Sequence, residues 1–288
     1  MDDLPRLVVG GDGVLGAALV DALIAAGRDV VATTRRAPPT PGRLLLDLAA
    51  PLVDWPALPR VACAWLCAAV TSQAACERDP QGSWRVNVEQ TVALAERLAR
   101  DGARVVFLST SQVFDGSRAR RTPADPPSPL TEYGRQKAAA EARLRAALGS
   151  RLVIARLTKV VAPDAPLFRG WLTALRRGET IRAFTDLRCA PLPLAWVAQA
   201  LVRLGAQPVA GIVHLSGERD VSYHEAACHL ARRLGVDPAL VQPGSAVEAG
   251  LPAGLRPAHT TLERNGWDPG PGLPWPTVAE AWDSLLAL

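Results

Sequence analysis

The first half of the chain alternates short apolar runs with amphipathic stretches. An apolar run of strand length, followed by a segment with apolar positions three and four residues apart, is typical of a β-strand and an α-helix in succession. Repeats of this unit predict an α/β fold with a doubly wound parallel sheet. The predicted strands are Leu7–Val9, Asp29–Thr33, Arg43–Leu46, Val61–Ala69, Arg104–Leu108 and Leu152–Leu157, and the clearest helices are Ala17–Ala26, Gln81–Arg100 and the run that begins at Thr131.

The alternation loosens in the last part of the chain. We expect a sheet domain over residues 1–160 and a smaller, irregular α/β lobe over residues 161–288, with residues 192–216 packing back on the sheet. The elements predicted there are helices at Leu167–Arg177 and Leu192–Leu204, a strand at Gly211–Ser216, a helix opened by a capping box at Ser222–Glu225, a loop over Val241–His259 and a closing helix at Thr277–Leu288.

A glycine-rich turn follows the first predicted strand. Gly10, Gly13 and Gly16 lie between this strand and its helix. Such a turn needs a residue with positive φ, a close approach of ligand to backbone, and tight packing of helix on strand. The helix would then present the free N–H groups of Val14 and Leu15 to a pyrophosphate. Any strand-to-helix turn can use glycine, but the position after an apolar strand favours a dinucleotide site.

Two arginines follow the second predicted strand. The sequence reads Thr33-Thr34-Arg35-Arg36 where a site for NAD would usually place an acid against the ribose hydroxyls. Arginines in place of that acid favour the 2′-phosphate of NADP, so NADP(H) is favoured over NAD(H). The alternative is that both are exposed loop charges. Asp47 and Leu48 close the third predicted strand, where a carboxylate can meet the adenine.

Tyr133 and Lys137 form the candidate catalytic pair. The run from Thr131 to Leu144 is rich in Ala, Glu, Arg and Leu and predicts a helix, on which residues four apart share a face. An ammonium there would stabilise the phenolate and lower the pKa of Tyr133 towards that of a general acid or base. A surface lysine beside a half-buried tyrosine is the alternative. It is disfavoured because the chain has only two Tyr and two Lys, Lys137 and Lys159.

Composition narrows the compartment and the partners. Of 288 residues, 49% are hydrophobic and 21% charged, and the net charge of +4 comes without runs of like charge, so neither nucleic acid nor a membrane is an expected partner. No apolar stretch is long enough to span a bilayer, and the N-terminus lacks a signal-peptide pattern. The 5 Cys show no CxxC spacing, which favours reduced thiols and a cytoplasmic location. The scattered histidines predict no metal site.

Longer segments carry a family resemblance. Ser109–Gly116, Ser128–Lys137 and Gly211–Gly217, and more loosely Arg256–Leu262, resemble the corresponding segments of extended short-chain dehydrogenases/reductases. Within that NAD-dependent epimerase/dehydratase superfamily the chain is most similar to the dTDP-4-dehydrorhamnose reductase family, over nearly its whole length. The resemblance implies a Rossmann-type sheet with a C-terminal substrate lobe.

The resemblance also implies roles for individual residues. Tyr133 would donate a proton to a carbonyl oxygen, Lys137 would hold the nicotinamide ribose and lower the pKa of Tyr133, and Thr110 would hydrogen-bond the substrate oxygen. Asn87 lies where such enzymes place a helix Asn, although an ordinary polar residue is equally compatible. The implied cofactor contacts are Gly10, Gly13, Val14, Leu15, Gly16, Arg35, Arg36, Asp47, Leu48, Ala68, Ala69 and Lys137.

Three positions bordering the sugar are Ser111, Gln112 and Lys159. The family usually has Asp-Tyr in place of Ser111-Gln112 and an aromatic residue in place of Lys159. The reductase chemistry survives these departures, whereas the identity of the sugar does not. Lys159 follows a strand at the carboxyl edge of the predicted sheet, where a compact ammonium can meet a substrate oxyanion.

The leading functional hypothesis is an NADPH-dependent reductase of a keto group on a nucleotide-activated deoxysugar. One alternative is a nucleotide-sugar 4-epimerase with retained NAD, against which Arg35 and Arg36 argue. Another is a non-catalytic, NADP-binding regulatory subunit. Dehydratase chemistry is excluded, because no Asp-Glu pair follows Thr110. The expected partner is a small-molecule nucleotide sugar, with a homodimer as a possible assembly.

Overall fold

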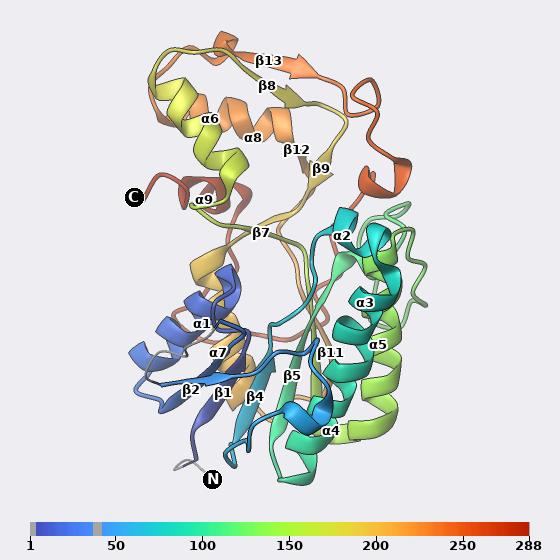
Figure 1. Ribbon diagram of the computed structural model, residues 1–288. Coiled ribbons are helices and arrows are strands. Elements are labelled where there is room, and N and C mark those ends of the chain that lie inside the picture. Colours follow the sequence, from blue (N-terminus) through green and yellow to red (C-terminus); the bar gives the residue numbers. More distant parts are fainter. Residues whose placement is uncertain (1–3, 37–41, 288) are drawn as a thin grey trace. The chain divides into compact units, whose positions relative to one another are not determined.

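The computed structural model describes residues 4–36 and 42–287 (Figure 1). Within these residues the chain forms two compact units, and each unit is assembled from separate segments. The first comprises the chain up to Val113 together with Pro127–Arg156 and Ala198–Val213. The second comprises Phe114–Pro126, Leu157–Val197 and the chain from His214 onward. From the sequence we expected one division near residue 160, with residues 192–216 packing back on the sheet. In the structure Ala198–Val213 belongs to the first unit, and Phe114–Pro126, which the sequence did not single out, belongs to the second.

A seven-stranded sheet organises the first unit, in the order β11-β6-β5-β4-β1-β2-β3. The central pairs are parallel, with Leu7 opposite Val31 on one side and opposite Ala64 on the other. The predicted doubly wound, Rossmann-type α/β fold is therefore confirmed. The strands are β1 (Arg6–Val9), β2 (Val30–Thr34), β3 (Arg43–Leu45), β4 (Cys63–Leu66), β5 (Arg104–Thr110), β6 (Leu152–Leu157) and β11 (Gly211–Leu215).

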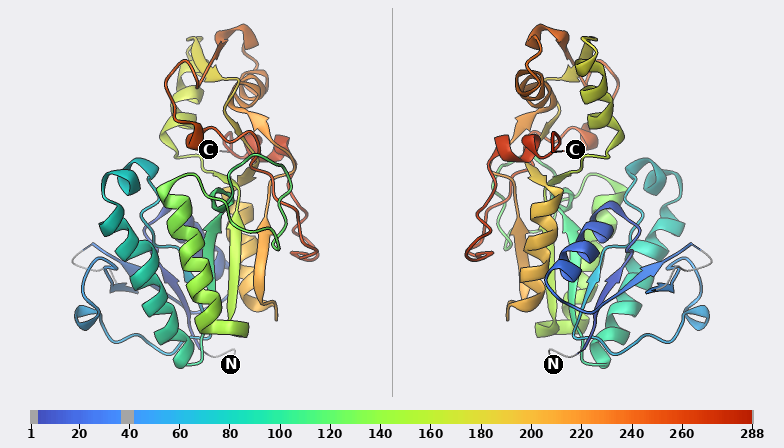
Figure 2. Two further views of the ribbon diagram at one scale, coloured as in Figure 1. Left: turned by 90° about the vertical axis from the view of Figure 1, so that its right-hand side faces the viewer. Right: turned by 90° about the vertical axis from the view of Figure 1, so that its left-hand side faces the viewer.

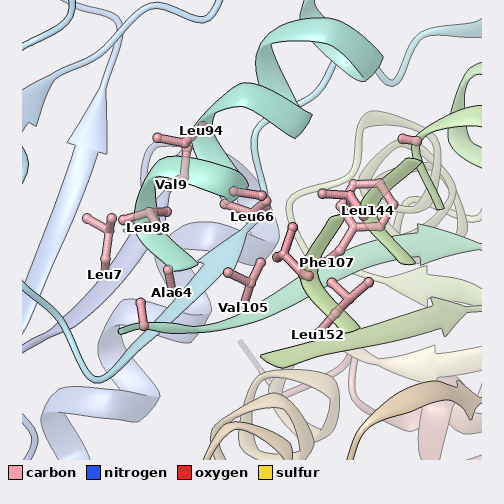
Figure 3. Close-up of a cluster of buried hydrophobic side chains, with 14 of the residues drawn as sticks. Leu7, Val9, Ala64, Leu66, Leu94, Leu98, Val105, Phe107, Leu144 and Leu152 are labelled. Atoms are coloured by element: carbon pink, nitrogen blue, oxygen red, sulfur yellow. The ribbon is translucent and has the colours of Figure 1, made fainter. Parts of the chain in front are cut away.

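Helices cover both faces of this sheet (Figures 1 and 2). One face carries α4 (Thr91–Arg100) and α5 (Glu132–Leu148), and the other carries α1 (Val14–Ala25) and α7 (Leu194–Ala206). Alternate residues of each strand point to the first face, since strand side chains alternate between faces. Figure 3 shows the resulting core of Leu7, Val9, Ala64, Leu66, Leu94, Leu98, Val105, Phe107, Leu144 and Leu152.

Trp65 anchors α7 on the opposite face. Its indole Nε1 donates to the carbonyl oxygen of Leu201 at 3.0 Å. A Cβ on Gly205 would lie 2.1 Å from the Trp65 ring, so only glycine lets the helix approach this closely. The strand and helix predicted within residues 192–216 thus become α7 and the edge strand β11.

The single helix predicted over Gln81–Arg100 is interrupted. Short helices α2 (Gln73–Arg78) and α3 (Pro80–Trp84) lead into a π-helical turn, Arg85–Gln90, before α4 begins. The side chain of Asp79 caps α3 by accepting from the Gly82 N–H at 2.9 Å. Thr91 donates its hydroxyl hydrogen to the carbonyl oxygen of Val86, five residues back, which stabilises the widened turn. The predicted helical span is present, but the change of pitch within it was not predicted, because the pattern of apolar residues does not reveal one extra residue in a turn.

The second unit contains three helices around an aromatic core. Phe168 lies edge-on to Trp171 and to Trp282, with ring centroids 5.7 Å and 5.4 Å apart. The segment predicted as a loop over Val241–His259 begins with a strand, and the closing helix ends at Asp283. The elements are α6 (Pro166–Arg176), α8 (Tyr223–Arg233) and α9 (Val278–Asp283), with the strand pairs β7 (Lys159–Val161) and β10 (Pro191–Pro193), β8 (Ile181–Phe184) and β13 (Val241–Gly244), and β9 (Arg188–Cys189) and β12 (Val221–Ser222).

Short 3₁₀ turns complete the described chain. They are Leu52–Asp54, Ser111–Val113, Gly149–Arg151, Pro238–Leu240 and Ala253–Leu255. The predicted capping box of α8 is confirmed, because the Glu225 N–H donates to Ser222 Oγ and the Ser222 N–H donates to Glu225 Oε2. Among the described residues, no helix combines the length and the hydrophobicity needed to cross a membrane.

Candidate active site

The glycine turn connects β1 to α1 at the carboxyl end of the sheet. Gly10 has a φ of +86°, and a Cβ there would lie 2.7 Å from the backbone nitrogen of Ala68. A Cβ on Gly16 would lie 2.1 Å from the carbonyl oxygen of Gly10. The chain itself therefore requires glycine at both positions. Gly13 adopts an extended conformation that any residue can take, and a Cβ there would make only an ordinary contact, 3.4 Å from the carbonyl oxygen of Gly10, so the fold itself does not require glycine at this position.

The first turn of α1 is free to receive an anion. No side chain caps the helix at Gly13, and its first turn contains no acidic residue. Val14 is 49% exposed, and Leu15 beside it is half-buried. The first N–H groups of a helix have no partner within the helix and carry the positive end of its dipole. This turn therefore fits the pyrophosphate of a dinucleotide cofactor.

Asp12, within the glycine turn, holds Arg43 against it. The Asp12 carboxylate accepts from the Thr34 hydroxyl and from Arg43 Nη1, the latter at 2.6 Å. A Cβ on Gly11 would lie 2.9 Å from that guanidinium nitrogen. Sequence reasoning missed this pair because Asp12 and Arg43 are far apart in the chain. The available signal was that Arg43 opens the strand paired with β2, where it lies opposite Ala32.

The other predicted cofactor residues differ in exposure. Arg35 and Arg36 are exposed and directly follow β2, while residues 37–41 lie outside the described chain. Asp47 is exposed, and its Oδ1 accepts from the Ala49 N–H at 2.9 Å. Leu48 is buried in the core, so its side chain serves packing.

Ala68 and Ala69 follow β4 and are half-buried. The Ala68 N–H donates to the carbonyl oxygen of Val9 at 2.9 Å, which holds this segment beside the glycine turn. The ends of β1 and β4 are therefore adjacent at the place where the sequence predicted the cofactor.

Tyr133 and Lys137 lie one turn apart on α5, as predicted, and both are buried, with 9% and 3% of their surface exposed. Thr131 caps the helix by accepting the Gly134 N–H at 3.1 Å. Lys137 Nζ lies 6.0 Å from the centroid of the Tyr133 ring and donates to the carbonyl oxygen of Leu108 at 2.8 Å. The ammonium is thus tied to β5 while remaining close to the tyrosine.

Burial controls the protonation of this pair. Desolvation raises the pKa of Tyr133 above its usual range, and it lowers the pKa of Lys137 to about 8. The predicted lowering of the Tyr133 pKa by Lys137 is therefore wrong, because the cost of burying a phenolate outweighs the attraction of the ammonium. Tyr133 is a neutral phenol at neutral pH. A neutral phenol is the form that can donate a proton.

Thr110 ends β5 and is buried, with its Oγ1 accepting the Gln112 N–H at 3.2 Å. Ser111 is half-buried in the turn that follows, and Gln112 accepts a hydrogen bond from the Gln73 side chain. Ser109, the residue before Thr110, donates its hydroxyl hydrogen to Glu141 Oε1. Neighbouring residues of a strand point to opposite faces, which explains the division between Ser109 and Thr110.

Asn87 has a defined structural task. It is buried in the π-helical turn, where its Oδ1 accepts from the Val70 N–H at 2.7 Å and its Nδ2 donates to Gln136 Oε1 at 2.7 Å. It therefore joins the segment that follows β4 to α5.

Two buried charged residues were not predicted from the sequence. Arg156 on β6 and Glu141 on α5 form an ion pair of 2.6 Å between Nη2 and Oε2. Glu141 is one turn beyond Lys137 on the same helix face, so the spacing of Tyr133, Lys137 and Glu141 was the signal that could have revealed it.

Lys159 belongs to the second unit and opens β7. Lys159 is exposed, and its Nζ lies 5.9 Å from the centroid of the Phe168 ring. Its N–H donates to the carbonyl oxygen of Ala190 at 3.2 Å, which fixes the backbone in the pair of β7 with β10.

A doubly wound sheet with a glycine turn after its first strand, and with buried Thr, Tyr and Lys side chains at its carboxyl edge, defines the class of this protein. It is an oxidoreductase of the extended short-chain dehydrogenase/reductase type. The comparisons give the family. Residues 6–287 match the family described as the RmlD substrate binding domain, and the chain belongs to this family.

Two curated relatives are of similar length. The chain is 31% identical to dTDP-4-dehydrorhamnose reductase of Streptomyces griseus over 277 residues, covering 93% of this chain and 89% of the relative. It is 30% identical to dTDP-4-keto-6-deoxy-D-glucose reductase of Streptomyces niveus over 266 residues, covering 91% and 89%. The crystal structure of dTDP-4-dehydrorhamnose reductase from Bacillus anthracis in complex with NADP has the same fold, with a TM-score of 0.83, 21% identity and 98% of each chain covered.

Proposed function

We propose that the protein is an NADPH-dependent reductase of a keto group on a nucleotide-activated deoxysugar. The observation that carries the proposal is the buried, neutral Tyr133 one turn from Lys137, on the helix that Lys137 ties to β5, the strand that ends at Thr110. Relatives whose names describe reduction of dTDP-linked keto sugars cover most of the chain, which supports the substrate class.

The cofactor supplies the hydride that reaches the carbonyl carbon. As the C=O double bond is reduced, its oxygen takes the proton of the Tyr133 hydroxyl, and the substrate leaves as an alcohol. Lys137 stabilises the tyrosinate that forms, which then regains a proton from water. Thr110 donates a hydrogen bond to the same carbonyl oxygen and so fixes the face presented to the hydride.

Cofactor preference follows from the arginines around β2 and β3. Arg35 and Arg36 follow β2 and are exposed. Arg43 is held beside the glycine turn by Asp12. Guanidinium groups suit a 2′-phosphate, and the sequence at the end of β2, Thr33-Thr34-Arg35-Arg36, has arginines in place of the acid usual for NAD. The Bacillus anthracis relative was crystallised with NADP, in agreement with this preference.

The competing functions are less well supported. A 4-epimerase retains NAD, which the arginines disfavour. A regulatory subunit needs no proton donor, yet Thr110, Tyr133 and Lys137 are all present and buried.

We further infer that Ser111, Gln112 and Lys159 contact the sugar nucleotide. The five free thiols are consistent with the cytoplasm, and light scattering would test for a homodimer.

A direct assay tests the proposal. Purified protein is mixed with NADPH or NADH and a panel of 4-keto sugar nucleotides, and the loss of nicotinamide absorbance is followed. We expect the wild type to reduce at least one 4-keto-6-deoxy sugar nucleotide, and to do so faster with NADPH than with NADH. Tyr133→Phe should keep only a small fraction of this activity. Binding of NADPH without turnover of any sugar would instead support the regulatory subunit, and interconversion of 4-epimers without net oxidation would support the epimerase.

A further inference from the structure

The ion pair of Glu141 with Arg156 is deeply buried in the first unit. Glu141 is 3% exposed and Arg156 1%. Arg156 Nε donates to Oε1 at 3.0 Å and Nη2 to Oε2 at 2.6 Å, while Ser109 Oγ donates to Oε1 at 2.5 Å. Burying such charges is costly, and apolar residues of similar volume often give equal or greater stability. The cluster therefore points to a role beyond packing.

The cluster continues the attachment of α5 to β5. Leu108 accepts a hydrogen bond from Lys137 through its carbonyl oxygen, and the next residue, Ser109, donates one to Glu141. Thr110 follows immediately in the strand. Consecutive residues of β5 are thus hydrogen-bonded to successive turns of α5. These bonds fix the position of Lys137 along the strand relative to Thr110.

Few charged groups face Lys137. The groups that act on its ammonium are the Glu141 carboxylate and the thiols of Cys67 and Cys76, and its nearest aromatic partner is Phe107, 4.4 Å from Nζ to the ring centroid. Burial raises the pKa of Cys67 to about 12 and also raises that of Cys76, so both thiols are neutral at neutral pH. The Tyr133 phenol is neutral as well. Among these groups, Glu141 is the one that carries a negative charge.

We propose that Glu141, held by Arg156 and Ser109, is a positioning residue that keeps the Lys137 ammonium charged and in register with Tyr133. Its purpose in catalysis rests on the proposed reductase function, whereas the charge of Lys137 is a property of the chain that can be measured without a substrate. Burial alone favours a neutral lysine, and the carboxylate opposes it.

The composition of the chain makes a direct measurement feasible. Lysine labelled with ¹³C at Cε gives two signals, because the sequence contains only Lys137 and Lys159. Lys159→Arg assigns them. The principal variant is the double substitution Glu141→Gln with Arg156→Met, since Glu141→Gln alone leaves Arg156 without this carboxylate.

We expect the pKa of Lys137 to fall by about one unit or more in the double variant. Glu132→Gln is the matched control, because Glu132 lies on the same helix and pairs with Arg135, 2.9 Å away, rather than with the lysine. It should leave the Lys137 titration unchanged. Glu141→Asp is the second variant, to be used if the double variant does not fold. It keeps the charge but draws it back by one methylene, so it should give a smaller fall in the pKa of Lys137. An unchanged Lys137 titration in either folded variant overturns the inference.

Kinetics then separate this inference from the proposed function. In the double variant the alkaline limb of the kcat profile should move to lower pH together with the Lys137 titration. A merely structural role would lower kcat equally at every pH and leave the lysine signal in place. If the wild type reduces no sugar nucleotide, the proposed function fails, while the shift of the Lys137 pKa still stands or falls by itself.

Discussion

Gly134, the residue after Tyr133, lies directly against the carbonyl oxygen of Gln112. A Cβ at this position would come within 2.3 Å of that oxygen. The start of α5 can therefore press against the turn that follows β5 only because residue 134 has no side chain. Through this contact the positions of Tyr133 and Thr110 become interdependent.

Gly134→Ala tests the contact. In an open helix the change would stabilise by about 1 kcal/mol, but here the added methyl must displace backbone. We expect the free energy of unfolding to fall by about 1–3 kcal/mol, with a loss of turnover. Denaturant titration measures the first effect. Gly170→Ala on α6 is the control, because nothing lies within 4 Å of its added Cβ, and it should stabilise. Equal stability changes in the two variants would contradict the steric argument.

Tyr133→Phe removes the proton donor and keeps the ring. Turnover should fall by roughly 10²–10⁴-fold, the typical loss of an acid–base group, while NADPH affinity stays nearly constant. Steady-state kinetics and fluorescence titration of the cofactor provide the two readouts. Turnover within a few-fold of the wild type would rule out Tyr133 as the acid and favour the regulatory role.

The arginines predict selective loss of NADPH affinity. A well-formed pair with a 2′-phosphate contributes about 1.5–3 kcal/mol, so replacing Arg35 and Arg36 by Ala should weaken NADPH far more than NADH. Arg43→Ala, made separately, shows whether the guanidinium held by Asp12 shares the task. Calorimetric titration gives both affinities. Arg100→Ala, at the distant end of α4, should change neither, and equal losses for the two cofactors would contradict the assignment.

Lys137 should leave a signature in the pH dependence of stability. Its pKa falls from 10.5 in the unfolded chain to about 8 in the fold, so between these values the unfolded chain binds more protons. Burial of the charged lysine therefore lowers the free energy of unfolding fully below pH 8. This loss disappears as pH rises towards 10.5, a gain on the order of 3 kcal/mol. Cysteines and tyrosines titrate in the opposite sense, so the comparison is with Lys137→Met. Chemical denaturation should show the stability advantage of the Met variant shrinking with pH. An advantage independent of pH would contradict the lowered pKa.

Lys159 is predicted to contact a substrate oxyanion. Lys159→Met should raise the KM for the sugar nucleotide and leave NADPH affinity unchanged. Lys159→Arg should rescue KM only partly, since the fork of a guanidinium differs in size and shape from an ammonium. A KM for Lys159→Met equal to that of the wild type would assign the residue to the surface.

Local patterns carried much of the fold. The strands of the large sheet, the glycine turn and the helix that carries Tyr133 and Lys137 were all predictable, because each depends on residues close together in the sequence. Pairings between distant segments were not. The contact of Glu141 with Arg156 requires knowing that β6 lies beside β5 under α5, and the contact of Asp12 with Arg43 requires the pairing of β2 with β3.

The direction of the Tyr133 pKa failed for a related reason. The sequence displays the nearby lysine, whose charge favours a phenolate, but it does not display burial. Burial is a property of the packed chain and has the larger effect here. The interruption of the predicted helix at Arg85–Gln90 is similar, since its apolar pattern is compatible with either pitch.

The π-helical turn makes the register of the neighbouring segment sensitive to chain length. It holds one residue more than a regular α-helical turn would, and each residue of a helix turns the chain by about 100°. Deleting the exposed Glu89 would let α3 and α4 merge into an unbroken α-helix, while rotating everything before the deletion by that angle. Asn87 would then point away from Val70 and Gln136. A loss of one residue that improves helical geometry would thus detach the segment after β4 from α5.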